Sequence, residues 1–270
     1  MKKQLLYTLL LVLPHALNSQ SFEHSNSWNN SLANSNIADT DFWNLKNNPA
    51  AAVYNNKLNI GIDVSNRFLI EDVNSALALG NININKNNKL VLSLSTFGNE
   101  YYNQNKASIA YALKLSNKLS SALQLCGTFN KIYSEEIKLL RFSPAMKLVV
   151  FYKINEFLNI SSAYLLESHP AEYSNKLTQE ISFGASYLLD ERVQMFYQAS
   201  YKNSSSTKMA IGLLVRFNEK ISAQIGVKNN DLSLSFGASF QIKSIRIVSS
   251  FSYQHYLGFS PSVSIQKTFN

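Results

Sequence analysis

The sequence predicts an all-β protein, a 14-stranded antiparallel transmembrane β-barrel, and three observations support this prediction. Apolar and polar residues alternate with a period of two from Lys57 to the last residue, as in strands with one apolar face. Most of the predicted strands have 9 to 12 residues, about the length that crosses a bilayer when tilted. Short links alternate with longer ones along the chain, which is typical of outer-membrane barrels.

The first residues have the three parts of a secretory signal peptide. Lys2 and Lys3 precede the apolar run Leu5–Leu13, and the polar run Asn18–Ser21 follows it. The apolar run is too short to span a bilayer as a mature helix, and two leading lysines do not suit a buried N-terminal helix. We therefore expect residues 1–19 to be removed on export.

The composition excludes several classes of protein. The chain is 46% hydrophobic but only 16% charged, and its single cysteine rules out a disulfide framework and a cysteine zinc cluster. The only long apolar run is at the N-terminus, which excludes a helical membrane bundle. Basic residues exceed acidic ones without clustering, so no nucleic-acid partner is expected.

The segment between the signal peptide and the first strand divides in two. Residues 20–40 are rich in Asn and Ser and have no period, so composition alone predicts a loosely held chain. After them, Asp41 could cap a short helix with Phe42 and Leu45 on one face, and Pro49 would end that helix.

The alternating pattern then gives fourteen strands, the sixth of which is apolar on both faces. Their predicted ranges are 57–67, 73–84, 89–97, 105–114, 118–130, 142–153, 157–167, 177–188, 191–202, 207–217, 220–228, 231–242, 244–255 and 260–269.

The links indicate how the barrel sits in its membrane. Those after even-numbered strands are short, such as Asn155–Glu156 and Lys243, whereas Gly98–Gln104 follows an odd-numbered strand and is longer. Short turns face the periplasm in such barrels. We therefore expect both termini to be periplasmic and the protein to lie in the outer membrane of a Gram-negative bacterium.

A soluble, secreted β-protein is the alternative to a membrane barrel. Fourteen long strands would make an unusually large sandwich, and the charged fraction is low for a solvated surface. In a membrane barrel the apolar faces meet lipid and the polar faces line the lumen. The expected partners are then outer-membrane lipid and lipopolysaccharide, whose anionic groups suit the basic excess.

Four short segments resemble a known family. These are Asp41–Ala50, with its Asn-Pro-Ala element, Asn66–Leu69, Ala110–Leu115 and Leu257–Pro261. They are similar to the FadL-like outer-membrane β-barrel family, in particular its Bacteroidetes members of the PorV/PorQ type in type IX secretion. The likeness covers most of the mature chain in strand layout. Two features depart from it: the loops are shorter than in the fatty-acid transporters, and Asn270 follows the terminal aromatic Phe269.

The resemblance implies that an N-terminal segment folds into the lumen as a hatch. Residues 20–56 match this hatch in position, and residues 57–270 would then form the barrel. The hatch or gate residues implied in this way are Trp43, Asn47, Asn48, Pro49 and Ala50.

Charged residues on the polar faces of the strands are candidates for the lumen, because charges at membrane depth face the interior and pair. They form either a selectivity or hatch-docking network, or a structural ladder of ion pairs that fills the lumen. The candidates are Asp63, Arg67, Glu180, Arg192, Arg216 and Arg246.

No enzyme, metal site or cofactor is predicted. His24, His169 and His255 have no second ligand at metal-binding spacing. A lipase would need His255 beside a serine that faces outward, but the alternating pattern places Ser262 and Ser264 on the lumen face of their strand.

Two functions remain open. In the first, the barrel binds or passes small hydrophobic molecules, with residues 41–53 as a gate. This function predicts an apolar pocket between the hatch and the inner wall, and a kink or gap in the wall for lateral exit. Alternatively it is a non-transporting barrel that binds secretion-system proteins and has a plugged lumen.

Overall fold

The computed structural model describes residues 25–133, 138–169, 176–203, 206–229 and 232–269. They form a closed barrel of fourteen antiparallel strands in sequence order, which confirms the predicted fold class. The predicted signal peptide, 1–19, and His24 lie outside the described residues. No helix within these ranges is long and apolar enough to cross a bilayer.

Each predicted strand range overlaps one strand of the structure. The largest difference is in the sixth, which is longer than predicted. The strands are β1 (Leu58–Asn66), β2 (Asn74–Asn83), β3 (Asn88–Gly98), β4 (Tyr102–Lys114), β5 (Leu119–Tyr133), β6 (Lys138–Lys153), β7 (Leu158–His169), β8 (Lys176–Leu188), β9 (Val193–Lys202), β10 (Lys208–Arg216), β11 (Ile221–Lys228), β12 (Ser233–Ile242), β13 (Ile245–Gln254) and β14 (Gly258–Phe269).

The barrel closes where the first strand meets the last. β1 pairs with β14 from Leu58 opposite Phe269 to Ser65 opposite Ser262, so the chain enters and leaves the barrel at the same end. We call this end, which carries the short turns after even-numbered strands, the turn end, and the opposite end the loop end. Within each pair of neighbouring strands the paired residues follow one another without a break, for example from Asn74 opposite Gly98 to Asn83 opposite Lys89. No break interrupts the paired ranges, although β6 and β7 pair only from Ala145 opposite Glu167 to Lys153 opposite Asn159, while β6 itself begins at Lys138.

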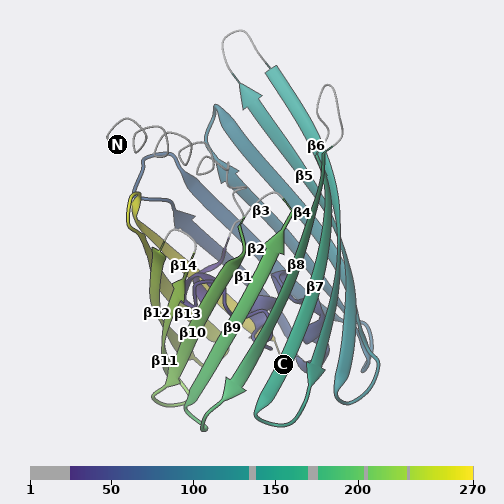
Figure 1. Cartoon of the computed structure of the whole chain (residues 1–270). Helices are drawn as coiled ribbons and strands as arrows, with labels where there is room; N and C mark the ends of the chain where they lie inside the picture. The colour runs from purple at the N-terminus through teal and green to yellow at the C-terminus, as the bar shows by residue number, and fades with distance from the viewer. Residues whose placement is uncertain (1–24, 134–137, 170–175, 204–205, 230–231, 270) are drawn as a thin grey trace, which may run out of the picture.

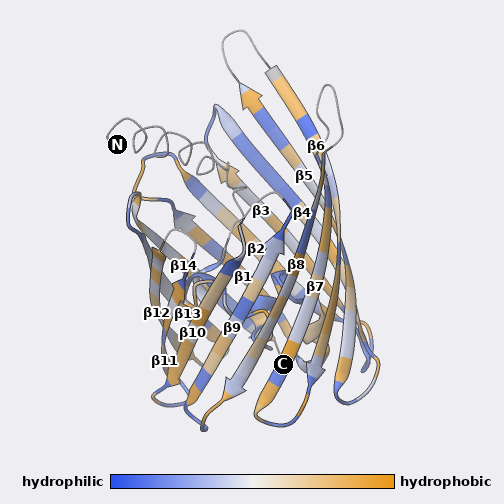
Figure 2. Cartoon of the chain, in the orientation of Figure 1, coloured by the Kyte–Doolittle hydropathy of each residue, from blue (hydrophilic) through white to orange (hydrophobic). Residues whose placement is uncertain are grey.

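The polarity of the wall is inverted relative to a soluble protein. Large apolar side chains such as Ile62, Leu94 and Ile211 are more than half exposed on the outer face. Serines face the lumen and bond across the strands, as do Ser222 with Ser239 and Ser250 with Ser262, both at 2.7 Å. Figure 2 shows the resulting alternation of apolar and polar bands along the strands. Such a wall suits a barrel surrounded by lipid.

Residues 25–56 lie inside the barrel (Figure 1). They contain helix α2 (Ser27–Ser31) and the 3₁₀ helices η2 (Phe42–Lys46) and η3 (Pro49–Tyr54). The Asp41 side chain caps η2 by accepting a hydrogen bond from the Trp43 N–H, as predicted. Pro49 does not end that helix, because η2 ends at Lys46 and Pro49 begins η3, where its missing N–H costs nothing.

The Asn/Ser-rich part of this lumenal segment is not loosely held, so that prediction was wrong for residues 25–40. Asn26, Ser27, Asn29 and Asn36 are at most 1% exposed. Their amides and hydroxyls bond to one another and to the backbone, as when Asn36 donates from Nδ2 to Asn29 Oδ1 at 2.9 Å. A chain of this composition would be disordered in water. Here it is ordered because the polar lumen supplies hydrogen-bond partners.

Candidate functional site

The candidate site is the contact between the lumenal segment and the barrel wall. Its first anchor is Asp63 on β1, which is fully buried. Asp63 Oδ2 accepts hydrogen bonds from the Ser27 N–H at 2.8 Å and the Ser27 hydroxyl at 2.6 Å. The Ser264 hydroxyl, on the neighbouring β14, donates to the same oxygen at 2.5 Å. Hydrogen bonds to a charged acceptor are among the strong ones, so Asp63 fixes the start of α2 to the barrel seam.

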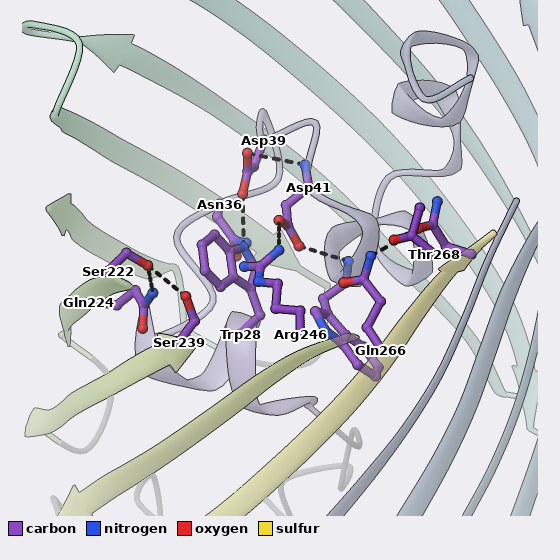
Figure 3. A network of polar contacts seen from close by, with 12 residues as sticks. Trp28, Asn36, Asp39, Asp41, Ser222, Gln224, Ser239, Arg246, Gln266 and Thr268 are labelled. Atoms are coloured by element: carbon purple, nitrogen blue, oxygen red, sulfur yellow. Dashed lines mark hydrogen bonds and ion pairs between the residues drawn. The ribbon is translucent and has the colours of Figure 1, made fainter. Parts of the chain in front are cut away.

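The second anchor is Arg246 on β13 (Figure 3). Its Nη1 donates to Asp41 Oδ2 at 2.5 Å, and both side chains are about one-sixth exposed. The guanidinium also lies 4.1 Å from the centre of the Trp28 ring, a cation–π distance. Trp28 in turn donates from Nε1 to Asp39 Oδ2 at 2.9 Å. One arginine of the wall therefore contacts both the helix α2 and the cap of η2.

Burial sets the protonation of Asp39. Desolvation, and then the nearby Asp41 carboxylate, raise its pKa to about 6, against the lowering effect of the Trp28 hydrogen bond and of Arg216. Asp39 lies between the helices of the lumenal segment and belongs to no strand. Its charged form is therefore disfavoured in the folded protein.

We expect this carboxyl to make stability depend on pH. The folded state holds the Asp39 proton up to about pH 6 and the unfolded chain only up to about pH 3.8. Stability from this group is therefore complete below the lower value and falls as pH rises between the two, by about 3 kcal/mol in total. Unfolding midpoints measured from about pH 4 to pH 7 should show this fall, and Asp39→Asn should remove it. An unchanged slope in Asp39→Asn contradicts the assignment.

Further hydrogen bonds join the segment to the opposite wall. Ser120 on β5 donates to the Ala50 carbonyl at 2.8 Å, and Ser186 on β8 donates to the Ala38 carbonyl at 3.0 Å. Asn48 donates from Nδ2 to the Ile37 carbonyl at 2.7 Å and to Ser161 on β7 at 3.2 Å. The segment is thus held to strands on both sides of the lumen.

Glycines on the wall let the segment approach closely. A Cβ at Gly226 on β11 would lie 2.3 Å from the Leu32 carbonyl carbon, and one at Gly61 on β1 would lie 2.5 Å from the Trp43 ring. Real Cβ atoms essentially never come so close, so a larger residue at either position would force the lumenal segment or the wall to shift. The same close approach to the segment occurs at Gly184, Gly212 and Gly237.

The segment separates two cavities in the lumen. The outer cavity, at the loop end, has a volume of about 710 Å³, and Ala33 and Ile37 of the segment line it. The inner cavity, at the turn end, has a volume of about 920 Å³, and Trp28 and Phe42 line it. Passage through the barrel therefore requires the segment to move or to loosen.

The five hatch residues implied by resemblance lie within this segment. Trp43, Asn48 and Ala50 are fully buried, and Asn47 lines the outer cavity. Pro49 starts η3. These residues therefore pack inside the lumen, and their role as a gate is a proposal.

The six predicted lumen charges lie at different places in the barrel. Asp63 and Arg246 hold the segment, as described above. Arg67 and Glu180 line the outer cavity, whereas Arg216 lines the inner one and donates to Gln194 at 2.8 Å. Arg192 is not on a strand but in the exposed turn between β8 and β9, because that strand begins at Val193.

Sequence reasoning missed Ser27, Trp28 and Asp39 and gave Asp41 only a capping role. The alternation of apolar and polar residues along the strands indicates which wall residues face inward. The lumenal segment has no such period, so the sequence does not show which of its residues contact the wall.

The residues considered for catalysis lie apart. His255 is exposed beyond the end of β13 and packs on Tyr256, while Ser262 and Ser264 are buried in the lumen. The lipase geometry is therefore absent. Among the described residues, no three His, Cys, Asp or Glu side chains are grouped as metal ligands would be.

The fold and the site together define a closed fourteen-stranded barrel whose lumen is occupied by its own N-terminal segment. Solved structures with this fold include the CymD monoaromatic hydrocarbon channel, with a TM-score of 0.69 at 11% identity over 91% of this chain and 98% of that one. A Pseudomonas aeruginosa FadL homologue matches with a TM-score of 0.66 at 10% identity, over 92% and 98% of the two chains.

The P. putida toluene transporter TodX matches with a TM-score of 0.61 at 11% identity, over 86% and 95% of the two chains. No protein-family model and no curated protein matches the sequence. At identities of 10–11%, this likeness establishes a shared barrel fold and nothing more.

Proposed function

We propose that this protein is an outer-membrane barrel of FadL-like type that binds or passes small hydrophobic molecules, with residues 41–53 as its gate. The observation that carries the proposal is the lumenal segment held between two cavities by Asp63 and Arg246. Its anchors are hydrogen bonds and one ion pair, contacts that can be exchanged for water when the segment moves. The structural neighbours include a monoaromatic hydrocarbon channel and a toluene transporter.

The proposed location is the outer membrane, with the turn end facing the periplasm. The support is the apolar outer face of a closed wall, since hydrocarbon tolerates no open strand edge. Lipopolysaccharide and membrane lipid are then the surroundings of the barrel.

A lysine on the outer face tests this location. Ile225 on β11 is half exposed, and we expect Ile225→Lys to destabilise the reconstituted barrel by about 2–4 kcal/mol, because the charge must enter lipid. Leu189→Lys, at a similarly exposed position in the β8–β9 turn, should change stability by less than about 0.5 kcal/mol. Urea unfolding in liposomes measures both, and equal effects would argue against a lipid-facing wall.

Transport is tested by dye uptake. Cells whose outer membrane carries the protein should take up a hydrophobic fluorescent dye faster than cells without it. The matched comparison is a barrel whose segment is cross-linked in place. Uptake no faster than in cells lacking the protein would overturn the transport proposal.

One observation favours the alternative, a non-transporting PorV/PorQ-like barrel that binds secretion-system proteins. The lumenal segment lies between the two cavities and leaves the barrel plugged in this state. That alternative predicts no dye uptake and a protein partner that co-purifies from the membrane extract.

A further inference from the structure

Lysines gather on one side of the turn end of the barrel, which is the lower end in Figure 1. They lie at the turn ends of β3, β4 and β6 and in the turns that follow β2 and β4. These lysines, which we call the lysine rim, are Lys86, Lys89, Lys114, Lys118 and Lys153. One acidic residue, Glu156 in the β6–β7 turn, occurs in the surrounding stretches 84–89, 112–120 and 151–158.

Backbone hydrogen bonds join the two turns of the lysine rim to the neighbouring strands. The Lys114 N–H donates to the Asn87 carbonyl at 2.9 Å, which ties the end of β4 to the β2–β3 turn. The Lys153 N–H donates to the Lys118 carbonyl at 2.8 Å, which ties the end of β6 to the β4–β5 turn. The rim is therefore one continuous surface from β2 to β6.

The ammonium groups of the rim bond to neutral partners. Lys89 is only 2% exposed, and its Nζ donates to Asn83 Oδ1 at 2.8 Å. Lys118 Nζ donates to the Ile154 carbonyl at 3.1 Å. Within the described ranges no carboxylate pairs with any of the five lysines. Their positive charge is therefore not cancelled by the barrel itself.

Two lysines of the rim lie close enough to repel each other. Lys153 Nζ lies 3.8 Å from the centre of the Tyr54 ring, a cation–π contact with η3 of the lumenal segment. The like charge of Lys114 acts on this ammonium group. Both side chains are half-buried, and a bound anion would relieve their repulsion.

The parts of the chain outside the described ranges connect to other places. Ser25, the first described residue, lines the outer cavity on the far side of the lumenal segment. Phe269, the last one, is on β14, which pairs with β1 and β13. The internal gaps follow β5, β7, β9 and β11, whereas every turn at the turn end is described completely.

The other half of the turn end carries both signs of charge. Asp190 and Glu191 stand beside Arg192 in the β8–β9 turn. In the β10–β11 turn, Glu219 stands beside Lys220. The excess of lysine is therefore a property of the rim and not of the whole turn end.

The residues that cap the turns add to this difference. In the β8–β9 turn, Asp190 accepts hydrogen bonds from the N–H groups two and three residues further on, at 2.7 and 2.8 Å. Asn85 and Ser116 accept the equivalent pairs of hydrogen bonds in the β2–β3 and β4–β5 turns. The rim thus has neutral caps where the other half has a carboxylate.

We propose that the lysine rim docks an acidic segment of another protein at the turn end of the barrel. Strand alternation turns Lys114 and Lys153 toward the lumen, in line with the buried Ala112 and Phe151, so they do not face surrounding lipid. Four strand spacings from β2 to β6 make the rim roughly 19 Å long, which is the length of about six extended residues. A run of about six Asp or Glu residues fits this length and charge.

This inference goes beyond the proposed function and does not depend on transport. The test uses the intact protein in phosphatidylcholine nanodiscs and a fluorescent hexaglutamate peptide, with binding followed by anisotropy at low ionic strength. We expect hexaglutamate to bind and neutral hexaglutamine not to bind. Raising the salt concentration to about 0.5 M should weaken hexaglutamate binding about tenfold or more, because exposed charges are screened. Absence of hexaglutamate binding, or binding that salt does not weaken, overturns the proposal.

Charge removal provides the matched variants. Lys86→Gln, Lys114→Gln and Lys118→Gln together should weaken hexaglutamate binding about tenfold or more. The control, which removes three positive charges from the other half of the same end, should change binding less than about twofold. It combines Arg192→Gln, Lys220→Gln and Lys243→Gln. Equal weakening by both variants would show attraction to net charge and overturn the rim as the site.

Two further arms complete the test. If the triple rim variant does not fold, Lys86→Gln with Lys118→Gln changes only exposed turns and should still weaken binding about threefold or more. Nanodiscs that contain phosphatidylglycerol should still bind the peptide through the rim. If that anionic lipid abolishes the difference between the rim variant and the control, lipid headgroups occupy the rim and the proposal is wrong. Failure of dye uptake with peptide binding intact would sink the transport proposal and leave the docking surface standing.

Discussion

Replacing Asp63 by alanine is expected to destabilise the barrel by about 3–5 kcal/mol, because it removes a buried charged acceptor and leaves its donors without a partner. The Ser27 N–H, the Ser27 hydroxyl and the Ser264 hydroxyl all donate to this one carboxylate. The start of α2 then loses its main contact with β1. We expect the lumenal segment to become mobile and the permeability of the barrel to rise with the loss of stability.

Urea unfolding in liposomes, followed by tryptophan fluorescence, measures the stability change. Asp63→Asn keeps one acceptor oxygen and should fall between the unaltered protein and Asp63→Ala. Glu191→Gln removes an acidic charge from the exposed β8–β9 turn and should have no measurable effect. An Asp63→Ala protein as stable as the Glu191→Gln control would contradict the anchoring role.

Replacing Arg246 by glutamine is expected to cost about 2–4 kcal/mol, since truncating one partner of a largely buried ion pair leaves the other charge uncompensated. Asp41 loses its cation and Trp28 loses the guanidinium over its ring. Arg246→Lys keeps the charge but not the planar group, so its stability should be intermediate.

Arg192→Gln is the matched control for this variant. Sequence parity placed Arg192 and Arg246 in the same lumen network, but only Arg246 contacts the lumenal segment. The unfolding midpoint of Arg192→Gln should equal that of the unaltered protein. Equal losses from both variants would mean that net charge, and not the ion pair with Asp41, determines stability.

The barrel could be predicted from the sequence because each strand carries its own signal. The alternation of side chains fixes which residues face inward, and so Asp63 and Arg246 were correctly placed on the inner face. Lys138–Lys153 was the most difficult strand, since an apolar run on both faces has no period to read.

The site could not be predicted in the same way, because its contacts join residues far apart in sequence. Asp41 and Arg246 are separated by 205 positions, and no periodicity relates them. Gly226 and Gly61 occupy strand positions that the alternating pattern assigns to the lumen. The neighbouring sequence does not show that the lumenal segment packs closely against these two glycines. The Asn/Ser-rich composition of residues 25–40 predicted a loosely held segment, but these residues are largely buried. Composition indicates how well a segment is solvated by water, and it does not show whether the fold supplies polar partners.

The central claim is that the N-terminal segment closes the lumen of a membrane barrel. Single-channel conductance in planar bilayers tests it most directly, comparing the intact protein with a variant that lacks residues 41–53. Heat-modifiable migration on a gel confirms that the variant is a folded barrel. We predict no steady conductance for the intact protein and clear channel steps for the folded deletion variant, and the same conductance in both would contradict the claim.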